Sequence, residues 1–533
     1  MEKMILRGRL YLLPIFLFCL FTRLQAQPFQ VFVQADSSFS NLPALHSGAV
    51  IQHQGKIIFV GGRTNGLHGF HPPLAFPTSG RNTQIQVYDP LTNTLSTGDL
   101  TQLDDSLFEP LSSSNMQFIH HGDFLYLIGG YGWNNQTNDF VTHDILIRIF
   151  LPQMLDSISS GGNLLPCFST IHQPFFKVCG GHAKKIGDDY YIVFGHSFDG
   201  IYNRNSSSGF FVQEYKNRVH KFNLGGNATM VVMNHTEMYD SLLFHRRDYN
   251  LIPQVFSPGT MGFTAFSGVF RRDRNLPFYT PVEIRSDGTW NEVAFEQQFA
   301  HYHSATATLL DTASGSQFNL FFGGMASYAK RNGQVVYDSL VPFVSSISMM
   351  VRSAAGNYSE WLMPDTMPGL LGTNAFFLPL QGLSLIEDEI IQMDQLSSGL
   401  QQIGWIIGGI ESPDPNISLS DPGLTFASSR VFRVYINNPL AGNVAEADKK
   451  IPTFHWQNPA GERFDFTVSN APEGSASLEF NDLSGKLVFK RTVQCKAGFN
   501  RFSEQINVLP SGIYLLNLTM PGFSSKGKVF VMH

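Results

Sequence analysis

The amino-acid sequence predicts an all-β protein in which repeated four-stranded sheets form a ring, followed by a small β-domain at the C-terminus. Of its 533 residues, 43% are apolar and 15% are charged, against a usual charged share of about 25%, so most of the chain is expected to pack into compact structure. The 47 Phe and 48 Gly suit short strands joined by tight turns. A pattern of alternating apolar residues that ends in a glycine pair also recurs along the chain.

The first 26 residues have the features of a secretory signal peptide. Lys3, Arg7 and Arg9 form a basic segment, residues 10–21 form a short apolar run, and Ala26 offers a cleavage site before Gln27. The alternative is a membrane anchor, but a spanning helix needs about 20 apolar residues. We therefore expect a cleaved signal over 1–26 and no transmembrane anchor in the mature chain.

The repeat predicts six blades, with seven as the alternative. Four clear copies end in glycine pairs, and two weaker copies lie around Gly195 and Gly268; the clear copies end at Gly62, Gly130, Gly324 and Gly409, and the last of them covers residues 390–409. Turns such as "HQGK" and "HHGD" indicate hairpins between the first two strands of a unit. Third strands are expected at 85–89, 144–150, 217–224, 346–352 and 429–436. Trp290 and Trp361 mark fainter fourth strands.

The two ends of the ring are expected to meet in one blade. The last unit has a third strand but no evident fourth, and residues 28–34 precede the first unit as a fourth strand would. Such pairing would remove the open sheet edges. The alternative is that 28–34 is a flanking extension.

The repeat resembles the Kelch family of β-propellers. The resemblance rests on the apolar run into Gly-Gly, on "VYDP" at 87–90 and on a Trp near the fourth strand, and it covers residues 27–440. The spacing of about 55–85 residues between glycine pairs exceeds the roughly 50 of Kelch repeats, which we attribute to long loops.

A linker over 441–452 leads to a C-terminal domain at 453–533, where short alternating strands predict a small immunoglobulin-like β-sandwich. The ordered words "NPA", "DLSGKLV", "LPSGIYLL" and "KGKVFVMH" resemble the type A sorting domain of the type IX secretion system. The motif residues are Asn458, Pro459, Gly485, Gly512, Tyr514 and Lys528. "HWQNPA" departs from the usual Tyr-Pro-Asn-Pro opening. The resemblance implies recognition by the type IX machinery of a Gram-negative bacterium, and release or attachment at the outer cell surface; the alternative is an accessory domain.

The loops that follow the glycine pairs are expected to gather on one face of the ring, where several blades could contact one ligand. Their aromatic, basic and acidic side chains suit a glycan or a protein partner. The candidate binding residues are Arg63, Asn65, Tyr131, Trp133, His196, Asp199, Tyr328 and Glu411. The alternative is that each is an ordinary solvated loop residue.

Other functions find little support. The net charge of −6 gives no basic field for nucleic acid. No nucleotide, hydrolase or zinc-protease motif is present, so we expect no cofactor and no metal, and we treat Cys167, Cys179 and Cys495 as buried thiols. The leading hypothesis is a non-enzymatic binding protein. The alternatives are a secreted carbohydrate enzyme of the sugar mutarotase or epimerase kind, as some Kelch propellers are, and a structural surface component.

Overall fold

The computed structural model describes residues 28–203, 211–226, 229–257, 259–331, 334–416, 424–438, 453–456, 460–471, 473–496, 498–520 and 523–532. The chain divides into two compact units, Met1–Ala441 and Gly442–His533. The expected signal peptide, the expected linker and the motif residues Asn458 and Pro459 lie outside the described residues.

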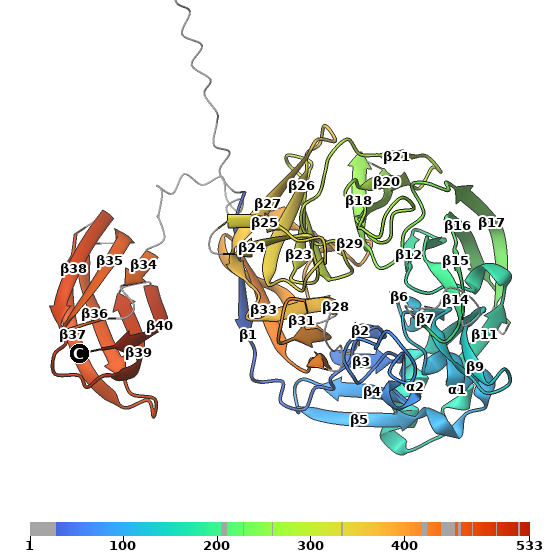
Figure 1. Cartoon of the computed structure of the whole chain (residues 1–533), viewed down its shortest axis with the longest axis horizontal. Coiled ribbons are helices and arrows are strands. Elements are labelled where there is room, and N and C mark those ends of the chain that lie inside the picture. Colours follow the sequence, from blue (N-terminus) through green and yellow to red (C-terminus); the bar gives the residue numbers. More distant parts are fainter. Residues whose placement is uncertain are drawn as a thin grey trace, which may run out of the picture. The chain divides into compact units, whose positions relative to one another are not determined.

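The first unit is a β-propeller, in which six antiparallel four-stranded blades form a ring (Figure 1). Blade 1 contains β2 (Ala49–His53), β3 (Lys56–Val60), β4 (Gln84–Asp89) and β5 (Thr94–Asp99). Blade 2 contains β6 (Gln117–His121), β7 (Phe124–Ile128), β10 (Ile145–Phe150) and β11 (Phe168–His172). Blade 3 contains β12 (His182–Ile186), β13 (Asp189–Val193), β16 (Arg218–Gly225) and β17 (Val231–Tyr239).

The other three blades follow the same order from the axis outward. Blade 4 contains β18 (Asn250–Ser257), β19 (Thr260–Phe266), β20 (Val282–Arg285) and β21 (Trp290–Glu292). Blade 5 contains β22 (Ala305–Asp311), β23 (Ser316–Phe322), β26 (Ser346–Arg352) and β27 (Tyr358–Thr366). Blade 6 contains β28 (Leu370–Pro379), β31 (Gly399–Ser412), β33 (Val431–Asn438) and β1 (Gln30–Ala35).

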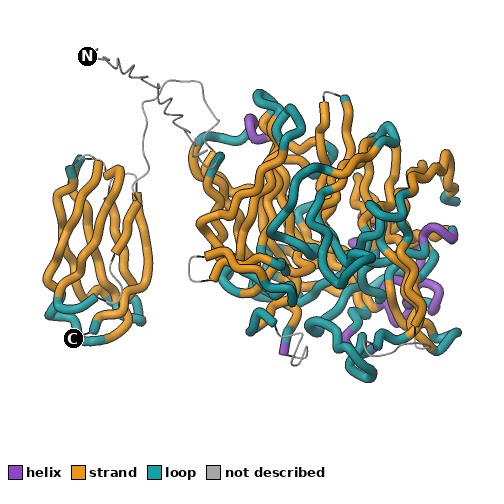
Figure 2. Tube along the Cα trace, turned by 45° about the horizontal axis from the view of Figure 1, so that its top comes forward, coloured by secondary structure: helices purple, strands orange, loops and turns teal. Residues whose placement is uncertain are grey.

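Smaller elements lie between these strands. The loops carry the hairpins β8 (Tyr131–Asn134) with β9 (Asp139–Thr142), β14 (His196–Gly200) with β15 (Phe211–Tyr215), and β24 (Tyr328–Arg331) with β25 (Gln334–Tyr337). Short strands β29 (Leu385–Ile386), β30 (Ile390–Gln392) and β32 (Phe426–Ala427) extend blades 5 and 6. The helices are α1 (Asp105–Leu111), α2 (Leu151–Ser160) and the 3₁₀ turns η1 (Thr78–Gly80), η2 (Leu100–Gln102), η3 (Leu165–Cys167), η4 (Pro174–Phe176) and η5 (Met393–Gln395); strands dominate the trace (Figure 2).

Ring closure is confirmed. β1 pairs with β33 in antiparallel register over six residue pairs, from Gln30 opposite Asn437 to Ala35 opposite Phe432. Asp36 then accepts hydrogen bonds from Arg433, at 2.6 Å from Nε and 3.1 Å from Nη2. Residues 30–35 therefore supply the outer strand of the last blade.

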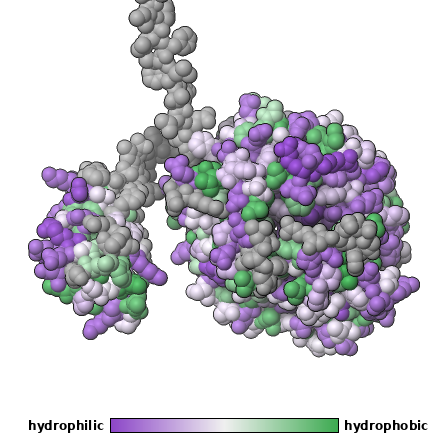
Figure 3. Space-filling view, in the orientation of Figure 1, coloured by the Kyte–Doolittle hydropathy of each residue, from purple (hydrophilic) through white to green (hydrophobic). Residues whose placement is uncertain are grey.

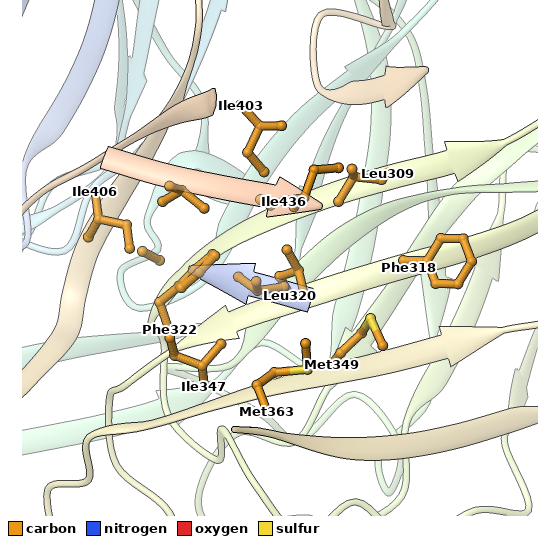
Figure 4. Packing of buried hydrophobic residues seen from close by; sticks show 14 of the residues in the cluster. Leu309, Phe318, Leu320, Phe322, Ile347, Met349, Met363, Ile403, Ile406 and Ile436 are labelled. Atoms are coloured by element: carbon orange, nitrogen blue, oxygen red, sulfur yellow. The ribbon is translucent and has the colours of Figure 1, made fainter. Parts of the chain in front are cut away.

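The cores lie between blades rather than within them. Each pair of neighbouring blades shares its own cluster of buried apolar residues, and these clusters continue around the ring. Figure 4 shows the cluster of blades 5 and 6, with Leu320 and Phe322 of β23 facing Ile406 of β31 and Ile436 of β33. The inner strands are buried on both faces, which explains why β3 ("KIIFV") shows no polar alternation. The face of the propeller seen in Figure 3 is largely hydrophilic or intermediate in hydropathy, with scattered hydrophobic residues.

The glycine pairs mark close approaches of backbone, as expected. Gly129 has a φ of +67°, and a Cβ there would lie 2.0 Å from the carbonyl oxygen of Val178, at the start of blade 3. The blade hairpins also follow the expected turn chemistry, since Gln54 and Gly55 both have positive φ. Any larger residue at Gly129 would push blades 2 and 3 apart.

Blade 6 departs from the sequence interpretation. The predicted unit ending at Gly409 was taken to begin near Ile390, but its innermost strand is β28, and residues 380–398 form a long connection to β31. In blade 4 the third strand is β20, for which the sequence pattern predicts no strand. The three mature cysteines are free and buried, in agreement with expectation.

The second unit is a β-sandwich. One sheet has the order β34 (Thr453–Trp456), β35 (Arg463–Ala471), β38 (Gly498–Gln505). The other has the order β37 (Leu487–Cys495), β36 (Gly474–Asn481), β39 (Gly512–Met520), β40 (Phe523–Val531). Buried apolar residues of both sheets, including Phe464, Phe480 and Leu518, form one core.

Candidate functional site

A cavity of about 610 Å³ lies along the axis of the propeller, and we call it the axial cavity. All six innermost strands contribute to its wall. One residue from each blade in order is Gln52, Gln117, Lys184, Leu251, Thr306 and Phe376. The wall combines amides, hydroxyls, imidazoles and aromatic rings, and the Phe118 and Phe376 rings lie 6.0 Å apart. Such a mixture suits a polar ligand with some apolar surface.

A ring of backbone hydrogen bonds narrows one end of the cavity. Six residues form this annulus, five of them two positions before an innermost strand and Asn374 within β28: Ser47, Asn115, Gly180, Asp248, His303 and Asn374. From Asn115 to Asn374, each N–H donates to the carbonyl oxygen of the preceding member, at 2.8–3.0 Å. Asn374 Nδ2 donates to Ser47 Oγ at 2.9 Å, which joins the last blade to the first. The annulus thus links all six blades around the axis.

Backbone conformation explains the residue types of the annulus. Ser47, Asn115, Gly180, Asp248 and Asn374 all have a φ between +51° and +62°. Gly, Asn and Asp adopt this left-handed region more readily than other residues. The sequence therefore carries a further signal that the glycine pairs do not mark, a small or polar residue two positions before five of the six innermost strands.

Two histidines lie at the annulus. His303 Nδ1 is 3.2 Å from Asn374 Oδ1, His182 Nε2 is 2.7 Å from the Tyr249 carbonyl oxygen, and the two imidazole rings are 5.0 Å apart. Burial lowers the pKa of both histidines. They are therefore neutral near pH 7. The neighbouring carboxylate, Asp248, forms an ion pair with Arg247.

The connection over 380–398, which we call the strap, reaches across the opposite end of the cavity. β30 pairs in parallel with β22 of blade 5. Three acidic residues of the strap contact blades 2 and 3: Glu387 Oε2 accepts from the Gly187 N–H at 3.2 Å, Asp388 lies 3.4 Å from His121 Nδ1, and Glu389 pairs with Lys184. The cavity reaches the surface beside the strap, at the hairpins of blades 1 and 2, where Gln54 and His121 are exposed.

The eight residues proposed from sequence lie beyond the annulus, on the side away from the blade hairpins, and none of them lines the axial cavity. Arg63 is buried, and its guanidinium donates to Asn65 Oδ1 at 3.0 Å and to the Pro77 carbonyl oxygen at 2.7 Å. Burial lowers its pKa to about 10. Tyr131 is also buried and donates to the Gly200 carbonyl oxygen at 2.7 Å.

Internal contacts also involve most of the others. His196 Nδ1 is 2.9 Å from Gln213 Nε2, Asp199 pairs with Lys177 at 2.7 Å, and Glu411 pairs with Arg430 at 3.0 Å. The structure brings four of the eight residues around one aromatic cluster of blades 2 and 3: Tyr131, Trp133, His196 and Asp199. Arg63, Tyr131 and Trp133 line a space of only about 10 Å³, which is room for about one water. Tyr328 lies apart, on β24, with its ring 5.2 Å from that of Tyr337.

Among the described residues, no group of three or more His, Cys, Asp or Glu is arranged to hold a metal ion. Within the same residues, no helix has the length and apolar character needed to cross a bilayer.

Comparison with known proteins identifies the C-terminal unit. Residues 456–532 match the family described as the secretion system C-terminal sorting domain. The tail is a type IX sorting domain, and the protein is exported to the cell surface or the extracellular space. No protein of curated function matches the sequence. A similar solved structure, titled "Structure of YjhT", covers 74% of this chain and 96% of its own at 12% identity, with a TM-score of 0.42.

The structure places the described sorting-motif residues on one sheet of the sandwich. Gly485 closes the turn between β36 and β37 with a φ of +87°, and its N–H donates to the Asp482 carbonyl oxygen at 2.9 Å. Gly512 begins β39, Tyr514 donates to the Pro510 carbonyl oxygen at 2.7 Å, and Lys528 on β40 pairs with Leu515. These residues fix turns and strand pairing within the tail.

Proposed function

We propose that this exported propeller, of Kelch-repeat type, is a binding protein that holds a small glycan in its axial cavity. The volume of about 610 Å³ supports the proposal, because small-molecule sites typically measure about 300–1,000 Å³. A folded protein partner would not fit inside such a space. The loop residues first considered, in contrast, have most of their polar groups engaged by the propeller itself.

The wall of the cavity suits a sugar. Sugars present several hydroxyl groups and also flat faces of C–H bonds. Amide and hydroxyl side chains such as Gln52 and Thr306 offer donors and acceptors, while Phe118 and Phe376 offer aromatic surface for stacking. The annulus at one end and the strap at the other leave the opening beside the blade 1 and 2 hairpins as the route for the ligand.

A blocked cavity tests this proposal. Gln52 is half-buried on β2 and lines the cavity, so Gln52→Trp should fill part of the space. Thr97→Trp, on the exposed outer strand of the same blade, is the matched control. A glycan array identifies the ligand of the mature chain, and titration calorimetry then compares the variants. We expect Gln52→Trp to weaken binding at least tenfold and Thr97→Trp to leave it unchanged; equal binding by the two variants would reject the cavity.

The enzyme alternative is favoured by one observation, the neutral pair His182 and His303 beside Asp248 at the annulus. Neutral imidazoles can exchange protons with a sugar hydroxyl. Saturation-transfer NMR of the anomeric protons of the sugar bound on the array distinguishes the two functions. Accelerated anomer exchange that is lost in His303→Gln would establish catalysis; unchanged exchange with retained binding supports the binding protein.

A further inference from the structure

A second surface, separate from the axial cavity, combines the exposed Tyr337 and two half-buried tyrosines with an exposed arginine. We call it the tyrosine–arginine surface, and it consists of Tyr279, Tyr328, Tyr337 and Arg274. It spans the loop 267–281 of blade 4 and the β24–β25 hairpin of blade 5. None of its residues lines the axial cavity.

The hairpin presents its tyrosines outward. Tyr328 pairs directly with Tyr337 across the two strands, and their rings meet at 5.2 Å in an edge-on arrangement. Residues two apart share a face of a strand, so Ala329 points to the opposite side, where it is buried against Ala326 and Val344. The tyrosine face is thus the outer one, and Tyr337 is 50% exposed.

The neighbouring loop completes the surface. Tyr279 donates to Ser327 Oγ at 3.4 Å, directly before β24, and its phenol neighbours that of Tyr337. Arg274 lies within electrostatic reach of Tyr337. Three aromatic rings and a guanidinium from two blades therefore gather in one place.

The loop is basic on a protein that is acidic overall. Residues 271–274 contain three arginines and one aspartate, giving a net charge of +2, whereas the chain carries −6. The Asp273 carboxylate accepts hydrogen bonds from Nε and Nη2 of Arg271, at 2.9 and 3.0 Å, and from Nε of Arg274, at 2.9 Å. Arg274 is exposed, and among the described residues only its Nε is shown in a hydrogen bond, so its terminal nitrogens are available to an anion.

We propose that the tyrosine–arginine surface binds an acidic saccharide, a carbohydrate chain that carries carboxylate or sulfate groups. Tyrosine rings stack on the C–H faces of sugar rings, and a guanidinium forms two parallel hydrogen bonds with a carboxylate or a sulfate. A surface formed by a β-hairpin and a neighbouring loop, outside the axial cavity, suits a repeating chain. The negative charge of the rest of the protein disfavours nucleic acid, whose charge density would meet repulsion outside the loop.

The test uses the mature full chain and surface plasmon resonance. The probes are polygalacturonate, dextran sulfate, neutral dextran, poly-glutamate and single-stranded DNA. The test variant is Arg274→Gln with Tyr337→Ala. The matched control is Arg218→Gln with Tyr239→Ala, because Arg218 lies 4.8 Å over the ring of Tyr239, which is 52% exposed on β17 of blade 3.

We expect the wild type to bind polygalacturonate or dextran sulfate but not neutral dextran, and the test variant to lose at least tenfold in affinity. The control should bind as the wild type does. Arg274→Lys with Tyr337→Phe should bind with intermediate affinity, which excludes a folding defect, and Gln52→Trp should have no effect. Binding of the test variant equal to that of the wild type would overturn the proposal, as would a preference for neutral dextran, poly-glutamate or DNA.

Discussion

Phe29→Ala tests how far strand β1 holds the ring closed. Phe29 directly precedes β1, is 4% exposed, and its ring meets that of Phe318 in blade 5 edge-on at 5.1 Å. It belongs to the largest cluster between blades. Removing a buried phenylalanine side chain costs about 3–5 kcal/mol, because apolar contacts are lost and a cavity remains.

Phe32→Ala is the matched control. Phe32 lies on β1 itself but points outward and is 38% exposed, so its truncation should cost less than about 1 kcal/mol. The two variants remove the same side chain from the same segment. Only the burial differs.

Hydrogen exchange of the β33 amides, residues 431–438, measures the effect locally. β33 pairs with β1, so its amides become accessible when β1 detaches. Because about 1.4 kcal/mol corresponds to a factor of ten, Phe29→Ala should speed exchange by at least about a hundredfold and Phe32→Ala by less than about tenfold. Equal rates in the two variants would refute the reasoning that burial of Phe29 holds the closing strand.

Three other outcomes follow from the geometry. His301 is fully buried, its Nδ1 accepts a hydrogen bond from the Ser327 N–H at 2.9 Å, and burial lowers its pKa to about 4. In the unfolded chain this histidine takes up a proton near pH 6.5, so the free energy of unfolding should fall by about 3 kcal/mol as the pH drops from 6.5 to 4. Urea unfolding of His301→Gln should therefore show a shallower pH dependence than that of the wild type. Glu389→Gln removes the ion pair with Lys184, a partly exposed contact that contributes at most about 1 kcal/mol to stability. Hydrogen exchange of the strap amides should therefore become up to about fivefold faster, whereas the control Glu411→Gln should leave that rate unchanged. Deletion of residues 456–532 should leave the protein in the periplasm of a host with a type IX system, as fractionation and immunoblotting would show; export of the shortened chain would contradict the role of the tail.

The propeller architecture was largely predictable because its signals are local. Close approach of neighbouring backbones requires glycine, as at Gly129, and a tight hairpin requires two residues with positive φ, as at Gln54 and Gly55. The third strands of five blades were predictable for the same reason, since β4, β10, β16, β26 and β33 lie within two residues of the predicted ranges. Ring closure followed from counting strands in the last unit.

The site was less predictable, because it depends on contacts between distant segments. Arg63 and Tyr131 have the residue types of a binding site, yet folding directs their polar groups to the carbonyl oxygens of Pro77 and Gly200. The apolar residues around Ile390 also fit the pattern of an innermost strand of blade 6, so the sequence alone predicts such a strand where the structure has the strap. The three-dimensional structure shows that residues 390–392 pair with β22 of blade 5.

The pairing of β1 with β33 has a consequence for how the chain is made. Phe32 lies opposite Tyr435, so the two partners are separated by about 400 residues of chain. At a synthesis rate of about 5–20 residues per second, β1 leaves the ribosome about 20–80 s before its partner exists. The final blade is therefore assembled late. Until β33 is made, the edge of β1 must be kept from pairing with other chains, a task that chaperones on the export route could perform.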